Sequence, residues 1–265
     1  MPGMAAPLPA IFVSHGAPTL VFEDIPARGF LMRLGAALGR PRAVLCVSAH
    51  WDTAAPTASA APAPETIHDF YGFPEELYRL RYPAPGAPDV ARRAAGLLRE
   101  AGLDCAIDAT RGLDHGAWNP LLLIFPEADL PVAQLSVQSR QGPAAHLALG
   151  RALAPLRAEG VLVMGSGGAV HNLRQFHADR KTPAPWAIAF DDWLAERIAT
   201  GDDDALVNYR AVRADGHLAH PTDEHFLPLF VALGAGDGAP GRALHRSFAH
   251  GSLSMAAYAW GKLRG

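Results

Sequence analysis

The chain has 265 residues, of which 49% are hydrophobic and 18% are charged, and its formal net charge is -3. A chain of this size and composition can bury a large core without covalent cross-links, so we expect one catalytic domain spanning residues 1–265. The 21 Arg and 2 Lys are scattered among 26 acidic residues, which argues against a nucleic-acid partner.

The N-terminal segment and the cysteines indicate the compartment. The first 16 residues lack the charged start and long apolar core of a signal peptide, and no apolar run approaches the ~20 residues that a membrane helix needs. Cys46 and Cys105 form no CxxC pair, and Cys46 lies within the apolar run 43–47. We therefore expect a soluble cytoplasmic protein without a membrane partner, either a monomer or a small homo-oligomer.

Along the chain, short apolar runs bounded by Pro and Gly alternate with segments of helical period, as in a sheet with crossover helices. The predicted strands are 10–14, 43–49, 105–109, 132–137, 161–164 and 251–260. The predicted helices are 30–38, 90–101, 143–159 and 185–200, with another that begins at Asn119-Pro120, where Asn119 would be the N-cap. Segments 54–64 and 81–88 are expected to be irregular loops. The fold class is α/β, a three-layer domain with a central mostly parallel or mixed sheet flanked by helices.

Five of the twelve histidines fall at the ends of predicted elements. His15 and His50 directly follow strands, and His171 lies a few residues beyond another strand. His115 precedes the helix expected at 119, and His225 is expected in the first turn of a helix, whose positive end favours neutral imidazole. Because ligands of open α/β sheets bind beyond the carboxyl ends of the strands, we expect these side chains to converge there.

Imidazole is a common ligand of zinc and iron, and two or three imidazoles with an open coordination position make a catalytic metal site. A single histidine at a strand end is more often a hydrogen-bonded structural residue, so only several such histidines together indicate a metal site. On the residues alone, which three bind metal and which two transfer protons stays open. Solvated or structural roles are predicted for His146, His177, His217, His220, His245 and His250.

Competing motifs are incomplete. Gly165-Ser166-Gly167-Gly168 is followed by no Lys, and Val170 breaks the spacing of a dinucleotide-binding loop. Met164 stands where the hydrolase motif Gly-x-Ser-x-Gly needs its first Gly. We interpret Gly167 and Gly168 as a tight turn that directs His171 toward the crevice.

Taken together, the sequence resembles the class III extradiol ring-cleavage dioxygenases, in particular their 4,5-DOPA dioxygenase extradiol branch. The matching stretches follow the family order over nearly the whole chain: 9–18, 48–51, 68–74, 114–118, 165–167 with 171–173, and 224–229.

This resemblance implies that His15, His50 and His225 bind the metal. The metal would be Fe(II), although zinc can occupy such a site in a purified or crystallised protein. His171 would be the acid/base histidine close to the metal, and His115 a histidine that either supports the metal ligands from outside or orients the substrate. Other members of the superfamily use Glu as the third ligand, so Glu224 is an alternative, although the expected helix face favours His225.

The resemblance also implies the reaction, in which a DOPA-like catechol and O2 yield a muconic semialdehyde by extradiol cleavage. Residues expected at the substrate are His68, Tyr71, Phe73 and Trp51. Two alternatives come from other classes: a zinc-dependent hydrolase that uses the same histidines, and a non-catalytic binding protein of the same fold.

Overall fold

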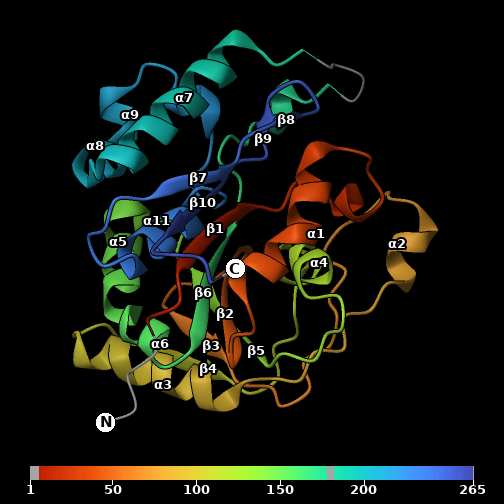
Figure 1. Cartoon of the computed structure of the whole chain (residues 1–265), viewed down its shortest axis with the longest axis vertical. Coiled ribbons are helices and arrows are strands. Elements are labelled where there is room, and N and C mark those ends of the chain that lie inside the picture. The colour runs from red at the N-terminus through yellow and green to blue at the C-terminus, as the bar shows by residue number, and fades with distance from the viewer. Residues whose placement is uncertain (1–5, 178–181, 265) are drawn as a thin grey trace.

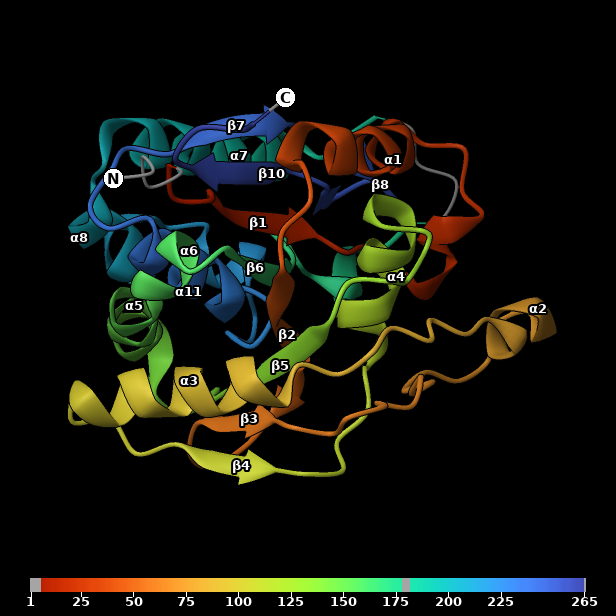
Figure 2. The same cartoon turned by 60° about the horizontal axis from the view of Figure 1, so that its bottom comes forward.

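The computed structural model describes residues 6–177 and 182–264, and a mixed eight-stranded sheet lies at its centre (Figures 1 and 2). Across the sheet the strands are β4 (Ala106–Asp108), β3 (Thr57–Ser59), β5 (Val132–Val137), β2 (Ala43–Asp52), β6 (Val161–Gly167), β1 (Ala10–Ser14), β10 (Ala257–Trp260) and β7 (Arg242–His245). Strands β5, β2, β6 and β1 are parallel, whereas β3 pairs with β5, and β10 with β1 and β7, in the antiparallel sense. A separate pair is formed by β8 (Phe248–Ala249) and β9 (Leu253–Ser254).

Helices cover both faces of the sheet, which confirms the three-layer α/β prediction. One face packs against α1 (Pro26–Leu38) and α4 (His115–Ile124). The other packs against α3 (Pro88–Glu100), α5 (Gly142–Leu153), α6 (Pro155–Ala158) and α11 (Leu227–Ala235).

The remaining helices lie beside these layers. The layer of α11 continues into α7 (Pro185–Thr200), α8 (Asp203–Val207), α9 (Tyr209–Val212) and α10 (Gly216–Ala219). Helix α2 (Glu75–Arg79) projects from the body in Figure 2. Two 3-10 turns, η1 (Pro18–Val21) and η2 (Leu173–Gln175), follow β1 and β6. No helix in the described ranges is long and apolar enough to cross a membrane.

The central strands are buried on both faces because their residues are almost all apolar. In β2, Val44 and Cys46 face the cluster of α1 and α4, whereas Leu45 and Val47 face the cluster of α3, α5 and α11. This alternation follows from the two-residue period of a strand. A continuous apolar run is therefore the expected signature of a sheet covered on both sides.

Four local predictions were wrong. Helix α4 begins at His115, with the side chain of Asp114 as its cap, so Asn119 and Pro120 lie inside it. Asn119 instead donates to the carbonyl of Pro18, 3.0 Å away. The segment 54–64 contains β3, the helix predicted at 143–159 is interrupted at Ala154, and the strand predicted at 251–260 is divided into β9 and β10.

Candidate active site

Three histidine side chains meet at the edge of the sheet where its parallel strands end. His15 follows β1, His50 lies near the end of β2, and β6 runs between these two strands. His225 comes from the turn before α11, which begins at Leu227, so the helix starts later than predicted. The Nε2 atom of His50 lies 3.1 Å from Nε2 of His15 and 3.2 Å from Nε2 of His225.

Each of these rings has an oxygen partner at its other nitrogen. Nδ1 of His15 lies 3.0 Å from Ser166 Oγ, and Nδ1 of His225 lies 3.1 Å from Glu224 Oε1. Nδ1 of His50 lies 3.3 Å from Asp69 Oδ2. An ionised carboxylate can only accept a hydrogen bond, so the Nδ1 atoms of His50 and His225 carry hydrogen and donate it, and their Nε2 atoms carry lone pairs.

The donor set fits a divalent metal ion. Nitrogen ligands bind such ions at about 2.0–2.1 Å, which places neighbouring nitrogens roughly 2.8–3.4 Å apart for octahedral to tetrahedral angles. The two Nε2 separations, 3.1 and 3.2 Å, lie in this range. Lone pairs that face one another at this distance repel unless a cation lies between them. Outer oxygen partners at Nδ1 are also typical of metal-binding histidines.

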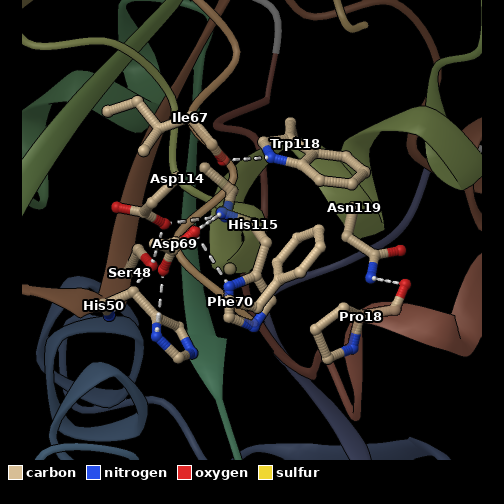
Figure 3. A network of polar contacts seen from close by, with 12 residues as sticks. Pro18, Ser48, His50, Ile67, Asp69, Phe70, Asp114, His115, Trp118 and Asn119 are labelled. Atoms are coloured by element: carbon tan, nitrogen blue, oxygen red, sulfur yellow. Dashed lines mark hydrogen bonds and ion pairs between the residues drawn. The ribbon is translucent and has the colours of Figure 1, made fainter. Parts of the chain in front are cut away.

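Asp69 contacts two histidines of the site at once (Figure 3). Its Oδ1 lies 3.0 Å from Nδ1 of His115 and accepts the backbone N–H of His115 at 2.9 Å, while Oδ2 faces His50. Burial alone would raise the pKa of Asp69, but hydrogen bonds from the side chain and the backbone of His115 outweigh burial and lower it to about 2. Asp69 therefore stays ionised and orients both rings.

The position of Pro120 within α4 has a consequence for His15. Proline has no N–H, so Pro120 cannot donate to the carbonyl of Gly116 four residues earlier. That carbonyl instead accepts a hydrogen bond from the Ser166 hydroxyl, which leaves the oxygen of Ser166 to accept from His15 Nδ1. The helix and β6 thus fix His15 together.

Two glycines let backbone approach the histidines closely. A Cβ at Gly116 would lie 2.3 Å from the Ser48 hydroxyl and 2.9 Å from Cδ2 of His50. Ser48 is the residue of β2 that pairs with Ser166 of β6. A Cβ at Gly167 would lie 2.1 Å from the carbonyl oxygen of His225. Gly167 ends β6 and has no positive φ, so the prediction that it forms a tight turn was wrong. Its role is to admit the His225 segment.

A cavity of about 460 Å³ opens beside the histidines. Of the side chains predicted at the substrate, Phe73 lines it, together with Phe70, which was not predicted. The structure places the other three elsewhere: Tyr71 is 91% exposed, Trp51 is buried beside Arg111, and His68 bonds the carbonyl of Leu80. A hollow of about 490 Å³ near Asp52 and Ser139 contains no histidine.

His115 and His171 also line the cavity. The His115 ring is 3.9 Å from that of His50, and the His171 ring stacks on that of His225 at 3.6 Å, both measured between centroids. No hydrogen bond joins the His171 ring to another side chain of the described ranges. Burial, above all, lowers the pKa of His171 to about 2. Its imidazole is therefore neutral.

Two groups of three possible metal ligands lie next to each other at this site. Ligand atoms of His15, His50 and His115 lie within 4.8 Å of one another, and so do those of His171, Glu224 and His225. His50 joins the two sets through its 3.2 Å separation from His225. Glu224 is turned toward Nδ1 of His225, so its carboxylate supports this ring from behind.

Sequence reasoning missed Asp69, Ser166 and His250 as site residues, although Asp69 adjoins a predicted histidine. Their roles come from contacts between distant segments, such as the 3.0 Å contact of Ser166 with His15 across 151 residues. His250, expected to be structural, lines the cavity.

Comparison with known proteins gives concordant matches. The family model described as the catalytic LigB subunit of aromatic ring-opening dioxygenase matches residues 9–261. The 4,5-DOPA dioxygenase extradiol of Beta vulgaris is 43% identical over 252 residues, covering 93% of this chain and 94% of the relative. The protein of that name from Escherichia coli K12 is 43% identical over 237 residues, 87% of this chain and 86% of the relative. A crystal structure of an uncharacterized protein from Escherichia coli K12 superimposes with a TM-score of 0.81 at 37% identity, covering 96% of this chain and all of that one.

Proposed function

Because this chain belongs to the LigB family and is a ring-cleaving extradiol dioxygenase, we propose that it uses Fe(II) to cleave a DOPA-like catechol with O2. The product would be a muconic semialdehyde. The observation that carries this proposal is the meeting of three imidazole Nε2 atoms, with separations of 3.1 and 3.2 Å, beside a cavity of about 460 Å³.

The proposed ligands are His15, His50 and His225. Three neutral imidazoles leave coordination positions open, as a catalytic site requires. Glu224 is the weaker alternative because its carboxylate is engaged by His225 and by the hydroxyl of Thr222 at 2.9 Å. A ferrous ion in this position would supply a redox-active Lewis acid that acidifies the catechol hydroxyls and activates dioxygen.

The chain's own residues would bind the catechol and move its protons. Phe70 and Phe73 offer apolar walls to the aromatic ring. His171, which lines the cavity and whose ring forms no hydrogen bond to a described side chain, would accept a proton from a catechol hydroxyl at its ring nitrogen and later return it. His115, held at Nδ1 by Asp69, would present Nε2 to the substrate and fix its orientation.

Anaerobic reconstitution tests this proposal. Protein freed of metal is loaded with Fe(II) or Zn(II), mixed with L-DOPA, and exposed to oxygen in an electrode chamber. We expect oxygen uptake and a ring-opened product with iron and neither with zinc. The zinc-hydrolase alternative uses the same histidines, so hydrolysis of ester or amide substrates by the zinc form, without oxygen uptake by the iron form, would replace the proposal.

A further inference from the structure

The side chain of Asp114 is fully buried where the first turn of α4 packs against the sheet (Figure 3). Its Oδ2 accepts hydrogen bonds from Arg111 Nη2 at 3.1 Å and from Gln134 Nε2 at 2.9 Å. The backbone N–H of Asp114 donates to Gln134 Oε1 at 3.2 Å. A buried carboxylate is tolerated where it is paired and hydrogen-bonded in this way. Asp114 is therefore fixed by β5 and by the loop that precedes α4.

The other carboxylate oxygen of Asp114 connects the two segments that carry His50 and His115. Oδ1 accepts the hydroxyl of Ser48, on β2, at 2.6 Å, and the N–H of Ala117, in the first turn of α4, at 3.3 Å. The hydroxyl oxygen of Ser48 in turn accepts the backbone N–H of His50 at 3.2 Å. His115 is the first residue of α4, so the cap that Asp114 provides fixes its backbone. One oxygen atom thus supports both histidines.

The contact with Ser48 matters because β2 is irregular at His50. The pairing of β2 with β5 is regular up to Val47 and shifts before Asp52, and the pairing of β2 with β6 runs only to Ser48. The N–H of His50 lies within this irregular stretch, and it donates to a side chain. The position of His50 therefore depends on Ser48 and, behind it, on the carboxylate.

Helix α4 approaches β2 so closely that there is no room for a side chain at position 116. A Cβ at Gly116 would lie 2.9 Å from Cδ2 of His50. The rings of His50 and His115 lie side by side, with centroids 3.9 Å apart, and Asp69 contacts Nδ1 of both. Asp69 therefore orients the two rings, whereas Asp114 fixes the backbone that carries each ring.

Arg111 extends this network to the residue that follows His50. Its guanidinium carbon lies 5.2 Å from the centre of the Trp51 ring, within the range of a cation–π contact, while Nη2 pairs with Asp114. Trp51 is buried and does not line the cavity. The side chain expected at the substrate is thus part of the support of His50.

Building on the proposed function, we propose that Asp114 is a positioning residue that holds the metal ligand His50 and the substrate-orienting His115 at a fixed separation. It acts on His50 through Ser48 and on His115 through the cap of α4. Both carboxylate oxygens accept hydrogen bonds, so the NH2 group of an Asn at this position would face a donor in either orientation. Asp114 does not line the cavity, yet its loss should affect metal binding and turnover together.

Two variants interrupt this support at different points. Ser48→Ala removes the link to His50 and leaves the cap of α4 in place. Asp114→Ser keeps a capping hydroxyl, because Ser is a favoured N-cap residue, and removes the carboxylate that Ser48, Arg111 and Gln134 contact.

Asp191→Asn is the matched control. Asp191 is equally buried, and its carboxylate accepts hydrogen bonds from Ser254 Oγ at 2.6 Å and from Arg246 Nε at 2.8 Å. None of these three residues lines the cavity. For each protein, competition with a chromophoric chelator well below Tm gives the zinc affinity, and the visible spectrum of the Co(II)-loaded form reports the geometry at the metal. Oxygen uptake by the Fe(II)-loaded form with L-DOPA gives kcat and KM.

We expect Ser48→Ala to weaken zinc affinity about 10–100-fold, the range for outer partners of metal ligands, and to change the Co(II) spectrum. Asp114→Ser should do the same and lower kcat by about a further hundredfold, because His115 is displaced as well and a shift near 1 Å costs roughly that much. Asp191→Asn should lower Tm but change neither the zinc affinity nor the Co(II) spectrum.

Wild-type zinc affinity and Co(II) spectrum in folded Asp114→Ser protein would overturn the proposal. An equal loss of affinity in Asp191→Asn would also overturn it, because general destabilisation would then explain the effect. Should Asp114→Ser fail to fold by circular dichroism, Ser48→Ala decides the outcome. Failure of the proposed function is distinct, since His50→Ala would then keep the wild-type zinc affinity.

Discussion

Replacing Gly167 by Ala tests whether the His225 segment positions a metal ligand. The Cβ would lie 2.1 Å from the carbonyl oxygen of His225, and ordinary contacts begin near 3.4 Å, so the segment must retreat by about 1.3 Å. The same shift lengthens the 2.8 Å hydrogen bond from Gly168 N–H to that carbonyl. Because metal–ligand distances tolerate only about 0.2 Å, His225 would leave the coordination sphere.

The expected affinity loss for Fe(II) or Zn(II) exceeds the 10–100-fold typical of changes to outer hydrogen-bond partners. The steric cost to folding should be about 1–3 kcal/mol, which lowers Tm by a few degrees. Competition with a chromophoric chelator gives the affinity, and thermal unfolding followed by circular dichroism gives Tm.

Two control variants separate metal loss from general damage. Gly96→Ala on α3, where a Cβ meets nothing within 4 Å, should leave affinity unchanged. In Gly86→Ala the new Cβ would lie 1.8 Å from the carbonyl oxygen of Ala61, and neither residue lines the cavity. This variant should lower Tm and leave the metal affinity unchanged. Wild-type affinity in a folded Gly167→Ala protein would refute the assignment of His225 as a ligand.

Four further outcomes are expected. Asp69→Asn removes the charge that orients two histidines and should weaken metal affinity 10–100-fold in a chelator competition; an unchanged affinity counts against this role. His171→Ala should keep its metal by elemental analysis yet lose 10²–10⁴-fold in kcat, and loss of metal would make His171 a ligand. His225→Ala should lose metal far more completely than Glu224→Ala, and the reverse order would make Glu224 the third ligand. Burial lowers the pKa of His146, so the unfolded state takes up a proton that the native state does not as pH falls below about 6.5. The free energy of unfolding should then drop by about 1.4 kcal/mol per pH unit from this residue, and urea titrations should show a smaller drop in His146→Gln.

The sheet could be predicted from the sequence because its central strands are continuous apolar runs. The predicted strands 10–14 and 132–137 coincide with β1 and β5, whereas the short strand β3, with only three residues, carries no such signal. Asn119-Pro120 misled the prediction of α4 because a proline in a helix interior is normally costly. Here Asp114 caps the helix, and the carbonyl that proline leaves free binds Ser166.

The site could be predicted only in part. Strand ends place His15 and His50, because the carboxyl ends of parallel strands share one edge. The contacts of Asp69 and His250 could not be predicted, since Asp69 contacts His115 across 46 residues and His250 contacts a carboxylate near the N-terminus, Glu23. Such contacts between separate loops leave no periodic pattern in the sequence.

The reaction that we propose for this chain inserts dioxygen into a catechol beside its two hydroxyls. Its most direct test is to let the Fe(II)-loaded protein convert L-DOPA under ¹⁸O2 and to determine product mass and structure by mass spectrometry and NMR. The account predicts one O2 consumed per L-DOPA and a ring-opened semialdehyde with label in both the new aldehyde and the new carboxylate group. A quinone without label, or a product whose ring is cleaved between the two hydroxyl-bearing carbons, would contradict it.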